Sequence, residues 1–383
     1  MGEVLQVVLW ILVIGALVRL HTAFWSRYFE AARYGDMVHF ARTQDGWRLA
    51  LHRYRPPDLK FAQPVILCHG MGANRHNFDI SAERSLARDL AGRGFDVWSL
   101  ELRGAGMSDR PGWFTGRKGS YAFDDHLNFD VPAALECVAA ETGRSDVLWV
   151  GHSMGGMLGY AWQGLEREPR LAGLVTISAP VLLNVSGNVG WSHHLVRPMF
   201  FGHTIAFRPL ARFFSPMMGW PPRWLSRIVV LKNGMEGAVM RRCLVNLTEN
   251  TTGALMRQFF DWIRTGRFES TDGQTDYLGN LARIKVPVLI IAADADKIAS
   301  PEAVSPAYER VASEDRQLRI FGIDRGDDAD FGHGDILLGV HSRELLYPEI
   351  SNWLQQHASP ITGDVQVDSP KTDRGSAERP QAE

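Results

Sequence analysis

Short apolar runs alternate with helix-like stretches along most of the chain. Strand-like apolar runs occupy residues 64–68, 95–102, 146–150, 171–180, 287–294 and 317–323. Helical stretches are expected at residues 83–94, 130–143 and 343–356, the last with a local distortion at Pro348, and after the run at 146–150 through about Leu165. Short apolar strands separated by helices are typical of a mostly parallel sheet wrapped by helices, so we expect an α/β fold.

A β-hairpin is predicted before the first of these runs. Residues 38–42 (VHFAR) and 47–54 (WRLALHRY) are strand-like and flank Asp45-Gly46. Asp-Gly between two such runs is a strong signal for a tight hairpin turn.

The N-terminal segment is almost entirely apolar. Between Val4 and Leu20 only Gln6 and Arg19 are polar. A helix over these residues spans roughly 25 Å, slightly less than the ~30 Å hydrocarbon core of a bilayer. The aromatic-rich stretch 24–34 that follows is suited to a membrane interface. Residues 1–34 are therefore predicted to be a membrane anchor with a juxtamembrane helix.

The alternatives for this segment are a cleaved signal peptide and a buried or surface helix. The chain begins Met1-Gly2-Glu3, which lacks the positive charge of a signal-peptide start, and no clear A-x-A cleavage site follows. Arg19, Arg27 and Arg33 lie at or after the end of the apolar run. By the positive-inside rule, they favour a single-pass topology with the rest of the chain in the cytoplasm.

The strand–helix alternation breaks between residues 181 and 283. This stretch is too long for an ordinary loop and is rich in Trp, Phe and Met. These side chains are Trp191, Met199, Phe200, Phe201, Phe207, Phe213, Phe214, Met217, Met218, Trp220 and Trp224. We expect a helical cap inserted between two parts of one core, residues 35–180 and 284–358, and covering the carboxyl edge of the sheet. The polar stretch 359–383 predicts a disordered tail.

Composition narrows the function classes. The chain has 383 residues, with 45% apolar and 22% charged residues and a formal net charge of -2. Nucleic-acid binders usually carry a basic surface, so we expect no nucleic-acid partner. Cys68, Cys137 and Cys243 are far apart and form no CxxC pair, which argues against a zinc site or a disulfide framework. No metal is predicted, and Cys68 is expected to be a buried apolar side chain.

The strongest chemical signal is GHSMGG at residues 151–156, which follows a predicted strand and precedes a helix. A serine hydroxyl is a poor nucleophile and must be exposed to both a base and the substrate. A sharp strand-to-helix turn provides that exposure, and glycines flank it because the backbone is crowded there. Ser153 is therefore the predicted nucleophile. The alternative is a glycine-rich turn that serves only packing.

A second glycine-rich turn, HGMG at residues 69–72, follows the strand at 64–68. Attack on a carbonyl creates an oxyanion that needs preorganised donors. We predict the backbone N–H groups of Met71 and Met154 as these donors. His69 is expected to brace the loop by hydrogen bonding, and the alternative is again a plain tight turn.

The acid and the base are expected after the last two strands. Asp294 and Asp296 follow the run at 287–294, and His333 lies between two glycines after the run at 317–323. The order Ser153, Asp296, His333 along the chain is the order expected for a nucleophile, acid and base in this kind of fold. Asp296 is the predicted acid, and Asp294 is the second candidate. Alternatively, either carboxylate serves only to form a turn or to cap a helix.

Two further motifs are predicted to be structural. Residues 103–108 (RGAGMS) follow a strand but lack a helix-opening GxGxxG, which argues against dinucleotide binding. Asp124 and Asp125 are expected to shape the turn before the helix at 130, with Asp130 as its N-cap. Arg103 is expected to pair with Asp124 or Asp125.

Four stretches together resemble the α/β-hydrolase superfamily and, in detail, its lipase and lysophospholipase-like serine esterase branch. They are VILCHGMGAN, LAGRGFDVWSLELRGAGMS, WVGHSMGGM and FGHGDILLG. The resemblance covers roughly residues 38–357 and extends to acid lipases and polyester-metabolising relatives. It implies a triad of Ser153, Asp296 and His333 and no cofactor. The 181–283 insertion matches no family motif, so it implies no substrate-binding residues.

Hydrolysis of a carboxylic ester through an acyl-serine is the function we expect, with a lipid-like or other acyl ester as substrate. The alternatives within the fold are a thioesterase, an acyltransferase and a C–C bond hydrolase. A membrane-tethered binding protein with an inactive site is the alternative from another class. A serine nucleophile argues against epoxide and haloalkane hydrolases, which use an aspartate in this fold.

Overall fold

The computed structural model describes residues 2–31, 37–112, 120–168, 171–183, 204–218 and 234–361. In the first half of the chain the elements are α1 (Gly2–Tyr28), β1 (Met37–Arg42), β2 (Arg48–Tyr54), β3 (Val65–Cys68), η1 (Arg75–Asn77), α2 (Leu86–Gly92), β4 (Val97–Glu101), α3 (Phe123–Asp125), η2 (His126–Asp130), α4 (Val131–Thr142), β5 (Val147–His152), α5 (Met154–Gly164) and β6 (Leu171–Ile177).

In the second half they are β7 (Thr204–Ile205), α7 (Phe207–Phe214), η4 (Ser215–Met217), α8 (Gly237–Arg242), η6 (Cys243–Leu247), β8 (Thr251–Thr252), α9 (Gly253–Thr265), α10 (Tyr277–Asn280), η7 (Leu281–Arg283), β9 (Val288–Ala293), α11 (Pro301–Val304), α12 (Pro306–Arg310), β10 (Arg316–Phe321), η8 (Ile323–Arg325), α13 (Asp335–Leu338) and α14 (Ser342–His357).

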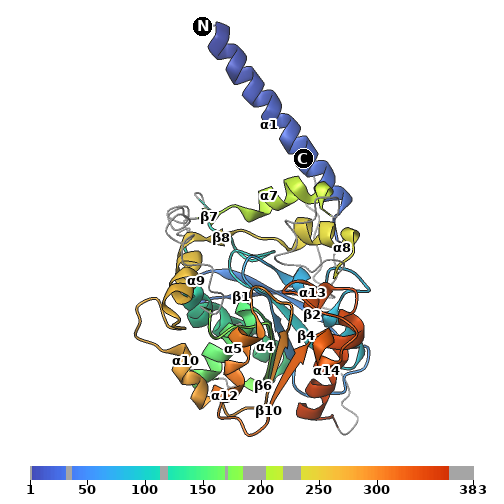
Figure 1. Ribbon diagram of the computed structural model, residues 1–383, viewed down its shortest axis with the longest axis vertical. Coiled ribbons are helices and arrows are strands. Elements are labelled where there is room, and N and C mark those ends of the chain that lie inside the picture. The colour runs from blue at the N-terminus through green and yellow to red at the C-terminus, as the bar shows by residue number, and fades with distance from the viewer. Residues whose placement is uncertain are drawn as a thin grey trace, which may run out of the picture.

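Within the described residues, the main sheet has eight strands in the order β1-β2-β4-β3-β5-β6-β9-β10. The pairs β1–β2 and β2–β4 are antiparallel, and all the other neighbours are parallel. The mostly parallel α/β sheet and its N-terminal hairpin are therefore confirmed. Figure 1 shows the sheet enclosed by helices.

The central strands are buried on both faces, which is why they are short continuous apolar runs. Their side chains alternate between two hydrophobic clusters, as the two-residue period of a strand requires. In β3, Ile66 and Cys68 belong to the cluster that includes α4 and α5, and Val65 and Leu67 to the one that includes α2 and α14. Cys68 is fully buried, as predicted.

The helix predicted from residue 130 begins earlier than expected. Helical backbone runs without interruption from α3 through η2 into α4, so Asp130 lies inside the run and its side chain caps nothing. The N-cap prediction is wrong because the carboxylate of Asp130 is used elsewhere: it accepts hydrogen bonds from Arg103 and contacts His126.

At the C-terminal end of the fold, α14 continues through Pro348.

The stretch between β6 and α10 contacts the loop that follows β3. The backbone N–H of Glu249 donates to the Gly72 carbonyl at 2.8 Å, and Asn74 Nδ2 donates to the Asn246 carbonyl. These contacts place its end at the carboxyl edge of the sheet, whereas α9 packs into the same cluster as α4 and α5. The exact boundaries 181–283 stay a prediction. Of the aromatic and Met residues that motivated it, Trp191, Met199, Phe200, Phe201, Trp220 and Trp224 lie outside the described residues.

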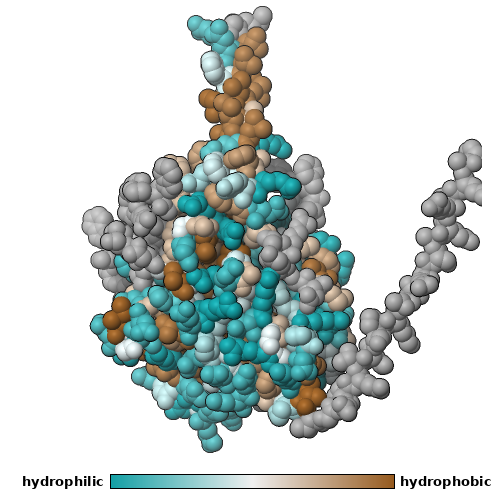
Figure 2. All heavy atoms as spheres, turned by 90° about the vertical axis from the view of Figure 1, so that its right-hand side faces the viewer, coloured by the Kyte–Doolittle hydropathy of each residue, from teal (hydrophilic) through white to brown (hydrophobic). Residues whose placement is uncertain are grey.

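Helix α1 projects away from the body of the protein (Figure 1), and its apolar side chains are exposed (Figure 2). Residues Glu3–Tyr28 are long and apolar enough to cross a membrane, and an 18-residue window within them has a mean hydropathy of 2.1, a property that an N-terminal signal sequence shares. At the other end, Ser359 and Pro360 pair with residues 61–63 and extend the fold beyond the predicted boundary at 358. Residues 362–383 of the predicted tail lie outside the described residues.

Candidate active site

Ser153 occupies a strained turn between β5 and α5. Its φ is +53° and its ψ is -122°, a backbone conformation that is uncommon for a residue with a side chain. The turn fits only because the residues two positions to either side of Ser153, Gly151 and Gly155, have no side chains. A Cβ on Gly155 would lie 2.1 Å from the Cys68 carbonyl oxygen, and one on Gly151 would lie 2.3 Å from the Gly155 carbonyl oxygen. The glycine pattern in the sequence thus reflects a close approach of α5 to β3.

Ser153, His333 and Asp296 form one hydrogen-bonded chain. His333 Nε2 lies 3.0 Å from Ser153 Oγ, and His333 Nδ1 lies 2.8 Å from Asp296 Oδ2. The residues come from the turn after β5, the loop after β10 and the turn after β9, all at the carboxyl ends of parallel strands. The structure therefore brings together the three side chains that the sequence singled out.

The two aspartates after β9 have different partners. Besides His333, Asp296 accepts hydrogen bonds on Oδ1 from the backbone N–H groups of Ile298 and Ala299, both at 2.8 Å. Asp294 instead accepts from the Arg325 guanidinium at 2.9 Å. Of the two candidates, only Asp296 contacts the imidazole.

The charge of Asp296 fixes the direction of the hydrogen bonds in this chain. Burial alone would raise the pKa of the Asp296 carboxyl, but His333 and the two backbone donors outweigh it and lower that pKa to about 2. An ionised carboxylate only accepts hydrogen bonds, so a neutral His333 ring carries its proton on Nδ1. Nε2 then faces the Ser153 hydroxyl with a free lone pair, as a general base must.

His152 contributes a contact that the sequence did not reveal. Its Nε2 donates to the backbone carbonyl of His333 at 3.0 Å and so ties the β5 turn to the loop that carries the imidazole. Burial, and next the proximity of His333, lower the pKa of His152 to about 3, so its ring is neutral at ordinary pH. Only the folded chain brings residues 152 and 333 together, which is why the motif GHSMGG assigns His152 no role.

The loop after β3 lies against the nucleophile turn. A Cβ on Gly70 would lie 3.1 Å from the Ser153 Cβ, and Gly72 has a φ of +67°. His69 holds this loop in place, since its Nδ1 lies 2.8 Å from the Gly70 carbonyl oxygen and its Nε2 accepts from the Leu102 N–H. The bracing role predicted for His69 is therefore confirmed. Met71 and Met154 belong to the two turns that meet here, and their role as oxyanion donors stays a prediction.

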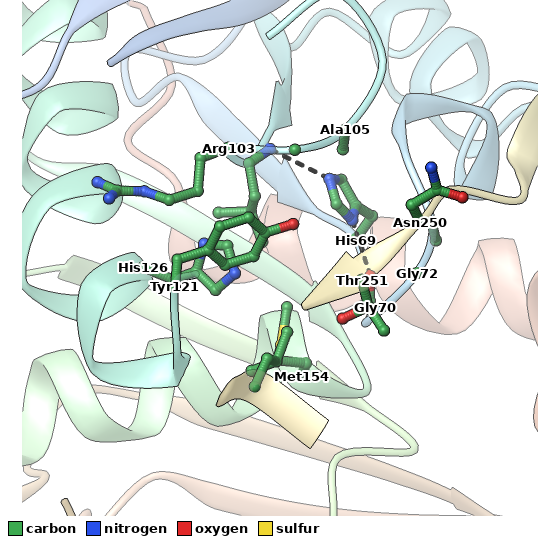
Figure 3. A pocket seen from close by; sticks show the side chains of 14 residues that line it. His69, Gly70, Gly72, Arg103, Ala105, Tyr121, His126, Met154, Asn250 and Thr251 are labelled. Atoms are coloured by element: carbon green, nitrogen blue, oxygen red, sulfur yellow. Dashed lines mark hydrogen bonds between the residues drawn. The ribbon is translucent and has the colours of Figure 1, made fainter. Parts of the chain in front are cut away.

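A pocket opens beside these two turns. It is lined by residues of both, Gly70, Gly72 and Met154, and by the side chains of Tyr121 and Thr251. Figure 3 shows the Tyr121 ring, Thr251 and Met154 facing the same space. Thr251 Oγ1 is buried and has no hydrogen-bond partner among the residues that the structure describes. The Thr251 hydroxyl is therefore a polar group in the pocket lining that no described residue binds.

Arg103 supports this region in a way that differs from the prediction. It does not pair with Asp124 or Asp125; its guanidinium binds Asp45 at 2.6 Å and Asp130 at 2.8 Å. The expected pairing is wrong because the hairpin turn that carries Asp45 folds over Arg103, a contact across about sixty residues that local sequence does not encode. Asp124 accepts instead from Gln258 and Tyr277.

The known proteins that this chain resembles include lipases. The profile of a family described as "Serine aminopeptidase, S33" matches residues 60–322. A probable lipase of Schizosaccharomyces pombe is 32% identical over 86% of this chain and 79% of its own length. Gastric triacylglycerol lipase of Bos taurus is 22% identical over 83% of this chain and 87% of its own. The solved structure of a monoglyceride lipase from Saccharomyces cerevisiae superposes with a TM-score of 0.58 at 17% identity, covering 86% of this chain and 97% of that one.

Proposed function

The chain belongs to the S33 serine aminopeptidase family of α/β hydrolases, and on this premise we propose that it cleaves lipid-like acyl esters through an acyl-serine on Ser153. Its relatives include lipases, and the chain is a carboxylic ester hydrolase. The observation that carries the mechanistic proposal is the continuous contact from Ser153 Oγ through His333 to a buried, ionised Asp296.

In the proposed first step, Ser153 Oγ attacks the ester carbonyl carbon while His333 Nε2 takes the hydroxyl proton. The backbone N–H groups of Met71 and Met154 stabilise the oxyanion of the tetrahedral intermediate. Collapse of the intermediate breaks the bond to the alcohol, which leaves with the proton that His333 returns. The acyl group is then bonded to Ser153.

In the second step, water attacks the acyl carbonyl and gives its proton to His333. The acid is released as the proton returns to Ser153 Oγ, so the enzyme ends unchanged. Asp296 stays ionised throughout and stabilises the imidazolium that forms twice per cycle. The cycle uses only ester and water, and we propose no cofactor.

Two features support a lipid-like substrate. The relatives named lipases align over most of this chain. The exposed apolar helix α1 would hold the protein at a bilayer, where acyl esters are concentrated. We propose that α1 is a retained, single-pass anchor with the hydrolase domain on the cytoplasmic side, following the arginines that end it.

An acyl-ester series beside Ser153→Ala tests the substrate proposal. We expect p-nitrophenyl esters of medium and long acyl chains to be cleaved faster than the acetate, and Ser153→Ala to remove this activity by several orders of magnitude. Preference for acetate alone would contradict the lipid-like substrate. Thioesters faster than the matched esters would favour a thioesterase, and an intact triad with no turnover of any acyl compound would favour a binding protein.

A further inference from the structure

Helix α7 presents its apolar face outward. Phe207, Leu210, Phe214 and Met217, the last in the adjoining η4, follow one another at intervals of three or four residues and so share one helical face. Their exposed fractions lie between 39% and 62%. An ordinary surface helix of a soluble protein buries such a stripe.

The polar face of α7 is turned toward the protein. The Arg208 guanidinium lies 3.3 Å from the carboxylate of Glu249, which is almost fully buried. Arg212 Nε donates to the Val245 carbonyl at 3.2 Å. The helix is therefore fixed to the body by its arginines, and its apolar side faces the surroundings.

Helix α7 lies next to the apolar helix α1. His21 Nε2 is 3.1 Å from the Phe213 carbonyl oxygen, and the rings of His21 and Phe213 lie 5.0 Å apart. The roughly twenty residues from the start of α1 to this contact span about 30 Å, the thickness of a bilayer's hydrocarbon core. Arg19 precedes His21 by two residues, about 3 Å along the helix axis. Figure 1 shows α7 lying across the base of α1, where a membrane surface would be if α1 spanned the bilayer.

We propose that α7 and η4 lie in the interface of the bilayer that α1 enters, with lipid covering Phe207, Leu210, Phe214 and Met217. This inference rests on the membrane insertion of α1 proposed above. The occupant is lipid because α7 packs against α1 at the level where a spanning helix would leave the hydrocarbon core, and apolar side chains exposed at that depth meet the interface of the bilayer.

The bilayer contact is linked to the pocket. Strand β7, which leads into α7, pairs with β8, so that Ile205 stands opposite Thr251, a residue that lines the pocket. The backbone N–H of Arg208 also donates to the side chain of Asn250, another lining residue. Docking of α7 therefore holds the pocket next to the membrane surface, which shortens the path of an acyl ester from bilayer to Ser153.

Photo-crosslinking of the full-length protein in phosphatidylcholine nanodiscs tests the proposal. A photoreactive benzoylphenylalanine replaces Leu210, Leu12 or Ile323 in turn; Leu12 lies in α1, and Ile323 is an apolar residue as exposed as Leu210, at 57% each, in η8. We expect radiolabelled lipid to be captured at positions 12 and 210, at least ten-fold more than at 323.

Capture at position 12 without capture at 210 would overturn the docking of α7 and leave the anchor intact. Capture at neither position would overturn both. A crosslink from 210 to a second copy of the chain would assign the stripe to a dimer and overturn lipid as its occupant.

A kinetic comparison gives an independent readout. In the full-length chain, the pair Leu210→Ser and Phe214→Ser alters only exposed side chains, and Ile323→Ser is the matched control. We expect the pair to lower the rate on a long-chain ester presented in vesicles about ten-fold, with the rate on a soluble short-chain ester unchanged. Equal loss on both substrates, or no loss on either, would contradict the proposal.

Discussion

At the scale of single residues, Asp294 and Asp296 stand two positions apart after β9 and differ in every contact. Asp296 is buried against His333, whereas Asp294 binds the exposed guanidinium of Arg325. If Asp296 orients the base, removing its charge leaves His333 in the wrong tautomer and without a partner for its positive charge.

We therefore predict that Asp296→Asn lowers kcat on a soluble ester by about 10²–10⁴-fold. Asp294→Asn, the matched control, should lower it by less than about three-fold. Steady-state kinetics of the two variants measures this difference. Similar losses in both would show that the acid has been assigned to the wrong residue.

The same carboxylate predicts a pH dependence of stability. Its pKa is about 2 in the folded protein against 3.8 for a free aspartate, so its ionised form stabilises the fold at pH values above about 4. This contribution is lost as the pH falls from about 4 toward 2. The thermal midpoint of the wild type should therefore fall more steeply over that interval than that of Asp296→Asn. Parallel curves would mean that the pKa of Asp296 is not depressed.

The sequence predicted the triad residues because each follows a strand in the chain order typical of the fold. It did not predict the contacts that join distant segments. His152 and His333 are separated by 181 positions, and Arg103 pairs with Asp45 of the hairpin turn, 58 positions away. Such partners depend on how loops fold over one another, which local periodicity does not record.

At the scale of elements, the turn between β5 and α5 sets the position of Ser153. Helix α5 starts so close to β3 that residue 155 must have no side chain. Strands and helices were predictable from the period of their apolar residues, but the helix around Asp130 was not placed correctly because η2 extends the helix backward past the expected cap.

We predict that Gly155→Ala destabilises the protein by about 2 kcal/mol or more, since the Cys68 carbonyl must shift, and that it lowers kcat as well. Gly92→Ala is the matched control: it lies at the end of α2 and its added Cβ meets nothing within 4 Å. Its thermal midpoint should stay the same or rise slightly. Equal behaviour of the two variants in thermal unfolding would argue against the close approach of α5 to β3.

At the scale of the whole molecule, a series of contacts in space joins the active-site turns to the cap elements, and the cap elements to α1. The contacts of Glu249 and Asn250 connect the loop after β3 to α7, and α7 contacts α1. The sequence shows that α7 is amphipathic, but it does not show that the apolar face points outward. That orientation depends on the contacts of Arg208 with Glu249 and of Arg212 with Val245.

The anchor predicts how the full-length protein fractionates. We expect it to remain with membranes after a wash in alkaline carbonate and to be released by detergent, with Met1 or Gly2 still at its N-terminus. Peptide mass spectrometry of the membrane fraction checks the terminus. A mature chain that starts after about residue 28 would identify α1 as a cleaved signal instead.

In the proposed mechanism, one acyl group is bonded to Ser153 in every turnover. Rapid acid quenching during hydrolysis of a long-chain p-nitrophenyl ester, followed by peptide mass spectrometry, tests it most directly. We expect the mass of the acyl group on the peptide that contains Ser153, increased in the pre-steady-state burst and absent in Ser153→Ala. Full turnover in Ser153→Ala, or an acyl adduct confined to another residue, would contradict it.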